Sequence, residues 1–370
     1  ELSELSVEEL HQLRSDYAHK EKIHSNTQHV LKVLLNSTYG CFSSKYFHYF
    51  DLESASAITS TGQLVVLHMC NKLEEILQKN FPFSGKYVVA ADTDSTYLSL
   101  DNIVDTIMVD HDFDTILESL TKFCDEYLSQ YLDVEFEKLM NRQNVLDRTY
   151  KAGREVIGSP GIFVKKKKYA IRVYNNEGVK LTKPKMKAMG LELIKSSTPE
   201  VCRNWLSTSV DLIMDNNIDE LKKFVKEKRK KFKTLTIEEL TSPRSINELN
   251  KWIMPDITAF GGKRTILKSG CPIHVRAAIS FNTLLGNEDT LNQITEGDKI
   301  TFCYLKEMNP YNAYDSKTHV MGFSGGIPKA FDSKYIDYDK QFQKNFLQPL
   351  LIITSALDWN ISNQDQPKFT

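Results

Sequence analysis

The sequence predicts an α+β protein in which short antiparallel sheets pack on long helices. An apolar, β-branched run around a polar turn at 87–100 indicates a β-hairpin, and an alternating run at 161–174 indicates a second strand region. Apolar residues recur at the 3.6-residue period of a helix over 7–39, 50–80 and 113–131. Long helices combined with hairpins favour this fold class.

Length and composition indicate a protein of ordinary globular character. The 370 residues, of which 41% are hydrophobic and 26% charged, suffice for roughly two or three packed units. A formal net charge of −1 excludes a uniformly basic nucleic-acid coat. The 6 cysteines show no C-x-x-C spacing, which argues against a zinc site and favours a reducing cytoplasm. No apolar run is long enough to span a bilayer, so we expect no membrane partner.

The first predicted helix is unusually polar. It begins at a capping box formed by Ser6 and Glu9, and Gly40 is typical of the position after a helix end. The segment 14–29 has few apolar residues. A helix this polar is poorly stabilised alone, so we expect it to pack against a partner that the rest of the chain does not supply.

One face of this helix has side chains suited to a polyanionic ligand. Gln28, Lys32, Asn36 and Tyr39 recur at helical spacing, opposite leucine and valine side chains. A lysine and two amides can bind phosphate oxygens, and the tyrosine presents a flat ring to a base. The alternative is a solvated polar face.

The predicted hairpin Tyr87–Leu100 carries Asp92 and Asp94 at its tip, within Asp-Thr-Asp-Ser. If strand geometry extends to both residues, the two carboxylates point to one side. Close carboxylates repel unless a cation lies between them, and Mg²⁺ prefers oxygen ligands. The pattern therefore predicts a magnesium site, with a solvated acidic turn as the alternative.

Lysine is concentrated at two further places. Lys165–Lys168 lies within the strand predicted at 161–174, before a turn at Asn175–Gly178, and Tyr169 adds an aromatic surface. Such a strand is costly in a half-buried sheet unless a polyanion lies along it, and the alternative is a charged edge strand. The basic stretch 221–235 is either a solvated face or a phosphate contact.

In combination these motifs resemble family B DNA polymerases. Lys32-x-x-x-Asn36-Ser37-x-Tyr39-Gly40 is similar to that family's fingers-helix motif, and Asp92-Thr93-Asp94-Ser95 is similar to its palm motif. The lysine run followed by Tyr169 resembles the family's Lys-Lys-x-Tyr motif, whose lysines reach the minor groove at the primer end. The segment 183–199 is most similar to the T-even-type bacteriophage members.

The resemblance implies a right-hand polymerase fragment with an antiparallel palm sheet packed on helices. It implies a helical fingers segment at 1–43, the palm at 44–190 and a mostly helical thumb at 191–370. Thr198 at the N-cap and Pro199 at N1 are expected to begin a thumb helix.

The resemblance also implies a role for each motif residue. Asp94 and Asp92 are the implied catalytic carboxylates that bind two Mg²⁺ ions, with Glu155 as an auxiliary metal ligand. The implied nucleotide-binding residues, which contact the dNTP, are Gln28, Lys32, Asn36 and Tyr39. The implied contacts to primer–template DNA are Lys166, Lys167, Lys168, Tyr169, Lys263, Arg264, His274 and Arg276.

Parts of the family pattern are missing from this sequence. It lacks the palm strand with a second essential Asp, the acidic exonuclease motifs and the first fingers helix. Two-metal chemistry needs ligands shared by ions roughly 3.5–4 Å apart. We therefore expect an N-terminal polypeptide, either separate or removed, to supply the missing Asp and the exonuclease. The given sequence begins with Glu1 and not with methionine, which agrees with the expectation that it is a piece of a longer product.

The expected function is Mg²⁺-dependent nucleotide addition to a primer 3′-hydroxyl, undetectable without the N-terminal part. Two alternatives stay open: a non-catalytic DNA-binding accessory fragment, and a polymerase that copies RNA or incorporates ribonucleotides. The resemblance implies a sliding clamp as a further partner, although the polar tail 360–370 does not resemble the family's short aromatic clamp-binding peptide. A phage-encoded enzyme would act in the host-cell cytoplasm.

Overall fold

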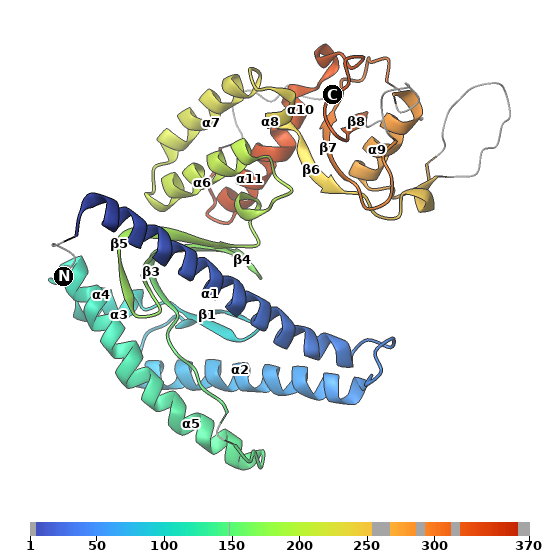
Figure 1. Cartoon of the computed structure of the whole chain (residues 1–370). Helices are drawn as coiled ribbons and strands as arrows, with labels where there is room; N and C mark the ends of the chain where they lie inside the picture. Colours follow the sequence, from blue (N-terminus) through green and yellow to red (C-terminus); the bar gives the residue numbers. More distant parts are fainter. Residues whose placement is uncertain (1–4, 148, 254–266, 286–292, 312–318, 362–370) are drawn as a thin grey trace. The chain divides into compact units, whose positions relative to one another are not determined.

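The computed structural model describes residues 5–147, 149–253, 267–285, 293–311 and 319–361. The chain forms two compact units, residues 1–154 and 155–370 (Figure 1). Each unit has its own hydrophobic core. Helices and three small antiparallel sheets make up the described parts, which confirms the predicted α+β class. No helix in these described parts is long and apolar enough to cross a membrane.

Unit 1 begins with two long helices, α1 (Val7–Phe42) and α2 (Leu52–Asn80), which run in opposite directions (Figure 1). The predicted capping box is confirmed, because the Ser6 N–H donates to Glu9 Oε2 at 2.8 Å and the Glu9 N–H donates to Ser6 Oγ at 3.3 Å. Helix α1 continues two residues beyond Gly40, and none of its residues is buried. The core of unit 1 therefore lies elsewhere, on the second half of α2.

The rest of unit 1 packs on that half of α2. Strands β1 (Val88–Asp92) and β2 (Ser95–Leu98) form the predicted hairpin. The helices that follow are α3 (Asp101–Ile107), α4 (Phe113–Lys122), the π-helical turn η2 (Phe123–Leu128) and α5 (Ser129–Arg142). The helix predicted at 113–131 thus extends to Arg142, because Leu132, Phe136 and Met140 continue its apolar period and are buried.

Unit 2 begins with a three-stranded sheet in the order β3 (Val156–Lys165), β4 (Lys168–Asn176) and β5 (Val179–Met189). The single strand predicted at 161–174 is wrong. Lys165 pairs with Lys168, so the chain reverses at the two residues between them. The turn predicted at Asn175–Gly178 is confirmed by the pairing of Asn176 with Val179.

The remainder of unit 2 combines helices with a second sheet of three strands. The helical segments are η3 (Glu192–Ile194), α6 (Glu200–Met214), α7 (Ile218–Phe232), α8 (Ile237–Leu240), η4 (Leu249–Trp252), α9 (Ile273–Leu284), η5 (Ser333–Tyr335), α10 (Tyr338–Phe342), η6 (Gln343–Leu347) and α11 (Gln348–Ser355). The sheet has the order β6 (Ser242–Ser245), β7 (Lys299–Tyr304) and β8 (Val320–Phe323). Pro199 occupies the cap of α6, so the expected Thr198 cap is wrong by one residue: Thr198 is buried and its N–H donates to Lys195 O at 3.0 Å.

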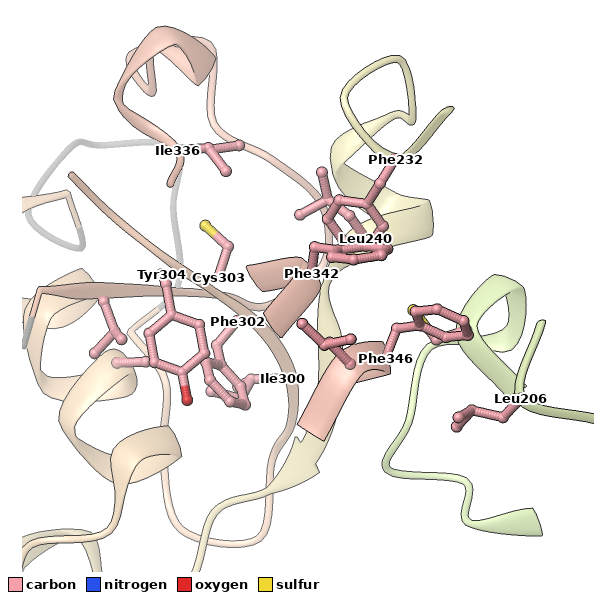
Figure 2. Packing of buried hydrophobic residues seen from close by; sticks show 14 of the residues in the cluster. Leu206, Phe232, Leu240, Ile300, Phe302, Cys303, Tyr304, Ile336, Phe342 and Phe346 are labelled. Atoms are coloured by element: carbon pink, nitrogen blue, oxygen red, sulfur yellow. The ribbon is translucent and has the colours of Figure 1, made fainter. Parts of the chain in front are cut away.

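An aromatic cluster joins these helices to the second sheet (Figure 2). The Phe342 ring centroid lies 5.4 Å from that of Phe232 and 5.2 Å from that of Phe346, and Trp205 lies 5.9 Å from Phe346. Figure 2 shows these phenylalanines with Ile300 and Phe302 of β7 in the same core. Helices from both ends of unit 2 are therefore held by one core.

Replacing Phe346 by Ala should destabilise unit 2 strongly, because the ring is 0% exposed and its removal leaves a cavity. We expect a loss of about 3–5 kcal/mol in the free energy of unfolding, measured by urea denaturation followed through tryptophan fluorescence. Val179→Ala is the control, since Val179 is 63% exposed. A loss in Phe346→Ala no larger than in the control would contradict this packing.

Candidate functional site

The acidic hairpin has a two-residue turn at its tip. Asp92, the last residue of β1, pairs with Ser95, and Thr93 adopts a left-handed φ of +57°. The N–H of Asp94 donates to Asp92 O at 2.7 Å, and Thr93 Oγ1 donates to Asp92 Oδ1 at 3.0 Å. Strand geometry therefore ends at Asp92. The two carboxylates therefore do not share one side of a continuous strand, which was the condition for the predicted arrangement. Asp92 is half-buried in the strand, and Asp94 is exposed in the turn.

The base of this hairpin is fixed to α2 by one carboxylate. Glu74 of α2 accepts hydrogen bonds from the N–H of Val88 at 2.8 Å and from the N–H of Tyr87 at 3.3 Å. The amide of Gln78, one turn later on α2, donates to Glu74 Oε1 at 3.0 Å and to Gly85 O at 2.8 Å. These hydrogen bonds satisfy backbone groups at the start of β1. They therefore fix the position of the hairpin, and with it the acidic tip, relative to α2.

Two further side chains support the same hairpin. Tyr87 is 0% exposed, and its hydroxyl donates to Phe81 O at 2.5 Å. On the neighbouring strand, Thr96 Oγ1 lies 3.2 Å from Cys70 Sγ of α2. Sequence reasoning missed Glu74 as a positioning residue. The available signal was its Glu-x-x-x-Gln pairing with Gln78, one helical turn away, beside the buried Leu73 and Leu77.

The donor chemistry at the tip suits a hard cation, because both carboxylates are oxygen donors. Within the described ranges, no three His, Cys, Asp or Glu side chains are grouped so as to hold a metal ion. Glu155, the predicted auxiliary ligand, directly precedes β3 in unit 2, and Lys187 Nζ donates to its Oε1 at 2.6 Å. Asp92 and Asp94 belong to unit 1. The role of Glu155 as a metal ligand therefore stays a prediction.

Helix α1 is unbroken through the predicted nucleotide-binding residues, so Gln28, Lys32, Asn36 and Tyr39 lie on one face. All four side chains are exposed, and Tyr39 retains 41% of its surface. On the opposite face, the apolar side chains are exposed as well: 49% for Ile23, 63% for Val30 and 64% for Leu34. Both faces of this helix are therefore free to contact other molecules.

The lysine run forms the tip of the β3–β4 hairpin. Lys166 and Lys167 are exposed in the turn, whereas Lys168 Nζ lies 3.7 Å from Glu192 Oε1. The predicted aromatic surface is wrong: Tyr169 is only 4% exposed, and its ring stacks on Phe163 at 5.6 Å. The difference arises because residues 169–171 of β4 are all buried, so Tyr169 lies in a packed stretch of the strand and not on a solvent-facing surface.

A glycine fixes the conformation of this tip. Gly190 has a left-handed φ of +66°, and a Cβ at this position would lie 2.0 Å from Lys167 O. Only glycine can approach that carbonyl so closely. Sequence reasoning did not assign Gly190 a role, although a glycine directly after a strand marks a candidate close approach.

The remaining predicted DNA contacts lie in the second half of unit 2. Lys263 and Arg264 lie outside the described residues. His274, in the first turn of α9, is half-buried, and its pKa is lowered by burial and by nearby Arg244. Arg276 Nη2 donates to Cys271 O at 3.3 Å. Both predicted contacts therefore also serve packing inside the unit.

We expect Glu74→Gln to weaken the attachment of the hairpin to α2 and to change its pH dependence. Burial raises the pKa of Glu74, but hydrogen bonds from Val88, Gln78 and Tyr87 outweigh it and hold the pKa below the ordinary value of 4.5. The carboxylate thus adds stability that is complete above its unfolded pKa and is lost as pH falls through the folded value. Above pH 4.5, hydrogen exchange of the Val88 amide should be faster in the variant than in the unsubstituted protein. On acidification, the variant should lose less further protection than the unsubstituted protein does. Equal acid dependence in both proteins would refute this assignment.

The Gly190→Ala substitution should destabilise unit 2 by more than Gly178→Ala. Both glycines have positive φ, but a Cβ at Gly178 meets open space whereas one at Gly190 meets Lys167 O. Positive φ alone costs an alanine about 1–2 kcal/mol, and the clash adds to that cost. Urea denaturation of the two variants measures the difference. Equal losses would show that the carbonyl contact does not constrain the tip.

A family model and several known proteins are similar to this chain. Residues 8–255 match the family model of DNA polymerase family B. The DNA-directed DNA polymerase of Escherichia phage RB69 is 29% identical over 340 residues, which cover 88% of this chain and 36% of that relative. The DNA-directed DNA polymerase of Enterobacteria phage T4 is 27% identical over 337 residues, which cover 86% of this chain and 36% of that relative.

A DNA polymerase of Paramecium bursaria Chlorella virus NY2A is 22% identical over 297 residues, covering 80% of this chain and 27% of the relative. The chain thus spans little more than a third of the two phage relatives. The resemblance inferred from the motifs, including the likeness to T-even-type phage enzymes, is confirmed. From the family match over most of its length, the chain belongs to DNA polymerase family B.

Proposed function

We propose that this chain is the C-terminal portion of a DNA-directed DNA polymerase that adds nucleotides from dNTPs to a primer 3′-hydroxyl. The observation that carries the proposal is the Asp-Thr-Asp-Ser turn, held on α2 by Glu74, in a chain of polymerase family B. The RB69 and T4 relatives are named as DNA-directed DNA polymerases, which supports the reaction class.

In this proposal Asp94 and Asp92 would hold two Mg²⁺ ions together with an Asp from outside the chain. The bound ions would lower the pKa of the primer hydroxyl and offset charge on the triphosphate. Thr93 Oγ1 orients Asp92 through its hydrogen bond to Oδ1, while the exposed turn leaves Asp94 accessible to ligands. Glu155 is an auxiliary ligand in the same proposal.

Helix α1 is proposed to bind the incoming nucleotide. Lys32 neutralises phosphate oxygens, and Gln28 and Asn36 donate hydrogen bonds to them. Tyr39 packs beside the new base pair. The exposure of this face supports the assignment, because each group is free to reach a ligand.

Primer–template DNA is proposed to contact unit 2. Lys166 and Lys167 are the exposed charges of the β3–β4 tip, and Lys168 adds a charge shared with Glu192. Tyr169 supports the tip from beneath rather than touching DNA. His274, Arg276, Lys263 and Arg264 belong to a second proposed DNA contact.

A preceding polypeptide is proposed to complete the enzyme. It would carry the missing palm Asp and the exonuclease, and it would cover α1, which has no buried residue over its 36 positions. The division into fingers at 1–43, palm at 44–190 and thumb at 191–370 is part of this proposal. A sliding clamp and a cytoplasmic location are proposed by analogy with replicative phage enzymes.

The test is Asp94→Asn in the enzyme completed with its preceding polypeptide. Nucleotide incorporation should fall by at least about a hundredfold, because several kcal/mol of charge stabilisation depend on the metal site. Affinity for the primer–template should change little. Asp110→Asn, at an exposed position away from the hairpin, is the matched control.

Unchanged incorporation in Asp94→Asn would overturn the proposal. If DNA affinity then still depended on Lys166 and Lys167, the chain would be a DNA-binding accessory fragment. Parallel assays with ribonucleotides and with an RNA template would determine sugar and template selectivity.

A further inference from the structure

Helix α7 has a charge distribution that its own packing does not require. One face of the helix is buried in the core of unit 2 through Leu221, Val225 and Phe232. Between residues 222 and 233 there are 8 lysines and arginines and one acid, Glu227. Lys222, Lys226 and Lys230 follow one another at four-residue spacing and are all exposed. We call these three residues the lysine edge of α7.

Several neighbouring cations have structural partners. Lys228 Nζ donates to Glu227 at 2.7 Å and lies 4.6 Å from the Phe224 ring, and the Arg229 guanidinium lies 5.5 Å from the Phe342 ring. Within the lysine edge, Lys222 has a partner as well, since its Nζ lies 3.9 Å from Asp219 Oδ1. Lys226 and Lys230 form no ion pair with any residue that the structure describes.

The physics of an isolated helix disfavours this arrangement. Like charges four residues apart repel, and the helix dipole stabilises cations only in the last turn. The dipole therefore accounts for Arg229, Lys230 and Lys231 but not for Lys222 or Lys226. A bound polyanion would offset the repulsion along the whole edge.

The chemistry of the edge favours a nucleic-acid backbone over an acidic protein. Lysine is depleted from protein–protein interfaces, whose cores need large apolar or aromatic anchors, and α7 exposes no large apolar side chain. Four residues of helix rise about 6 Å, close to the roughly 7 Å rise of two nucleotides along one strand. Lysine side chains at this interval can neutralise phosphates without reading sequence.

We propose that the lysine edge of α7 binds the phosphate backbone of single- or double-stranded nucleic acid, as a contact additional to the Lys166–Lys167 tip. This inference rests on the proposed function, because it presumes a polynucleotide substrate. It decides between the two interpretations of the basic stretch 221–235 in favour of phosphate contact, and it assigns that contact to three named lysines of α7.

The test compares two double variants of the 370-residue chain. Lys226→Gln with Lys230→Gln removes two charges from the edge, and Lys329→Gln with Lys344→Gln removes two exposed charges elsewhere in unit 2. Affinity for a thymidine oligonucleotide and for a blunt duplex is measured between about 50 and 200 mM salt. Thermal unfolding by circular dichroism checks that both variants fold.

In the edge variant, the negative slope of log affinity against log salt should become shallower, by about 1.8 on the duplex or by about 1.4 on the single strand. The ligand on which the slope falls identifies the source of the phosphates. The control variant should keep the original slopes. Unchanged slopes in the edge variant, or equal falls in the control, would overturn the proposal. Loss of poly-L-glutamate binding without a change in DNA slopes would overturn it in favour of an acidic protein partner.

The outcomes are separable from those for the proposed function. If Asp94→Asn abolishes incorporation while the edge variant keeps its salt slopes, only the inference about α7 fails. If the edge variant loses slope while Asp94→Asn still incorporates nucleotides, the polymerase assignment fails and the backbone contact stands.

Discussion

The hydrogen bonds from the backbone of Tyr87 and Val88 to Glu74 are the constraint on which the acidic hairpin depends. A two-stranded hairpin is marginally stable by itself, so its orientation has to come from an attachment to another element. Here the attachment is at the start of β1, beside the fully buried ring of Tyr87. The acidic turn at the other end is left accessible, which is the arrangement that a ligand-binding carboxylate requires.

A comparable constraint acts in unit 2 at the tip of the β3–β4 hairpin. Gly190 allows the close approach of Lys167 O, and Glu192 forms ion pairs with Lys168 and Lys195. Burial raises the pKa of Glu192, but the hydrogen bond from Lys195 and the charges of Lys168 and Lys195 outweigh it and keep the pKa below its ordinary value. The carboxylate is therefore charged at neutral pH. In this way Lys168, next to the turn, has a structural partner in Glu192.

Helix α1 has no comparable attachment. Its capping box and backbone hydrogen bonds are local, and its 36 residues bury nothing. Local interactions alone stabilise a helix weakly in water, since most helix stability in proteins comes from packing of an apolar face. In the proposed enzyme, the nucleotide-binding face would depend on contacts that the preceding polypeptide makes with the exposed Ile23, Val30 and Leu34. This dependence explains why we place the nucleotide site in a completed enzyme.

The sequence by itself determined the features that depend on neighbouring residues. The capping box at Ser6, the hairpin around Asp92 and the turn at Asn175–Gly178 follow from local hydrogen bonding and residue period, and the motifs identified the family. The tertiary structure decided what depends on distant residues. It placed a turn inside the lysine run, buried the ring of Tyr169 against Phe163 and brought Glu74 to the hairpin. The physical reason is that propensity and period act within a few residues, whereas burial and backbone satisfaction depend on partners far along the chain.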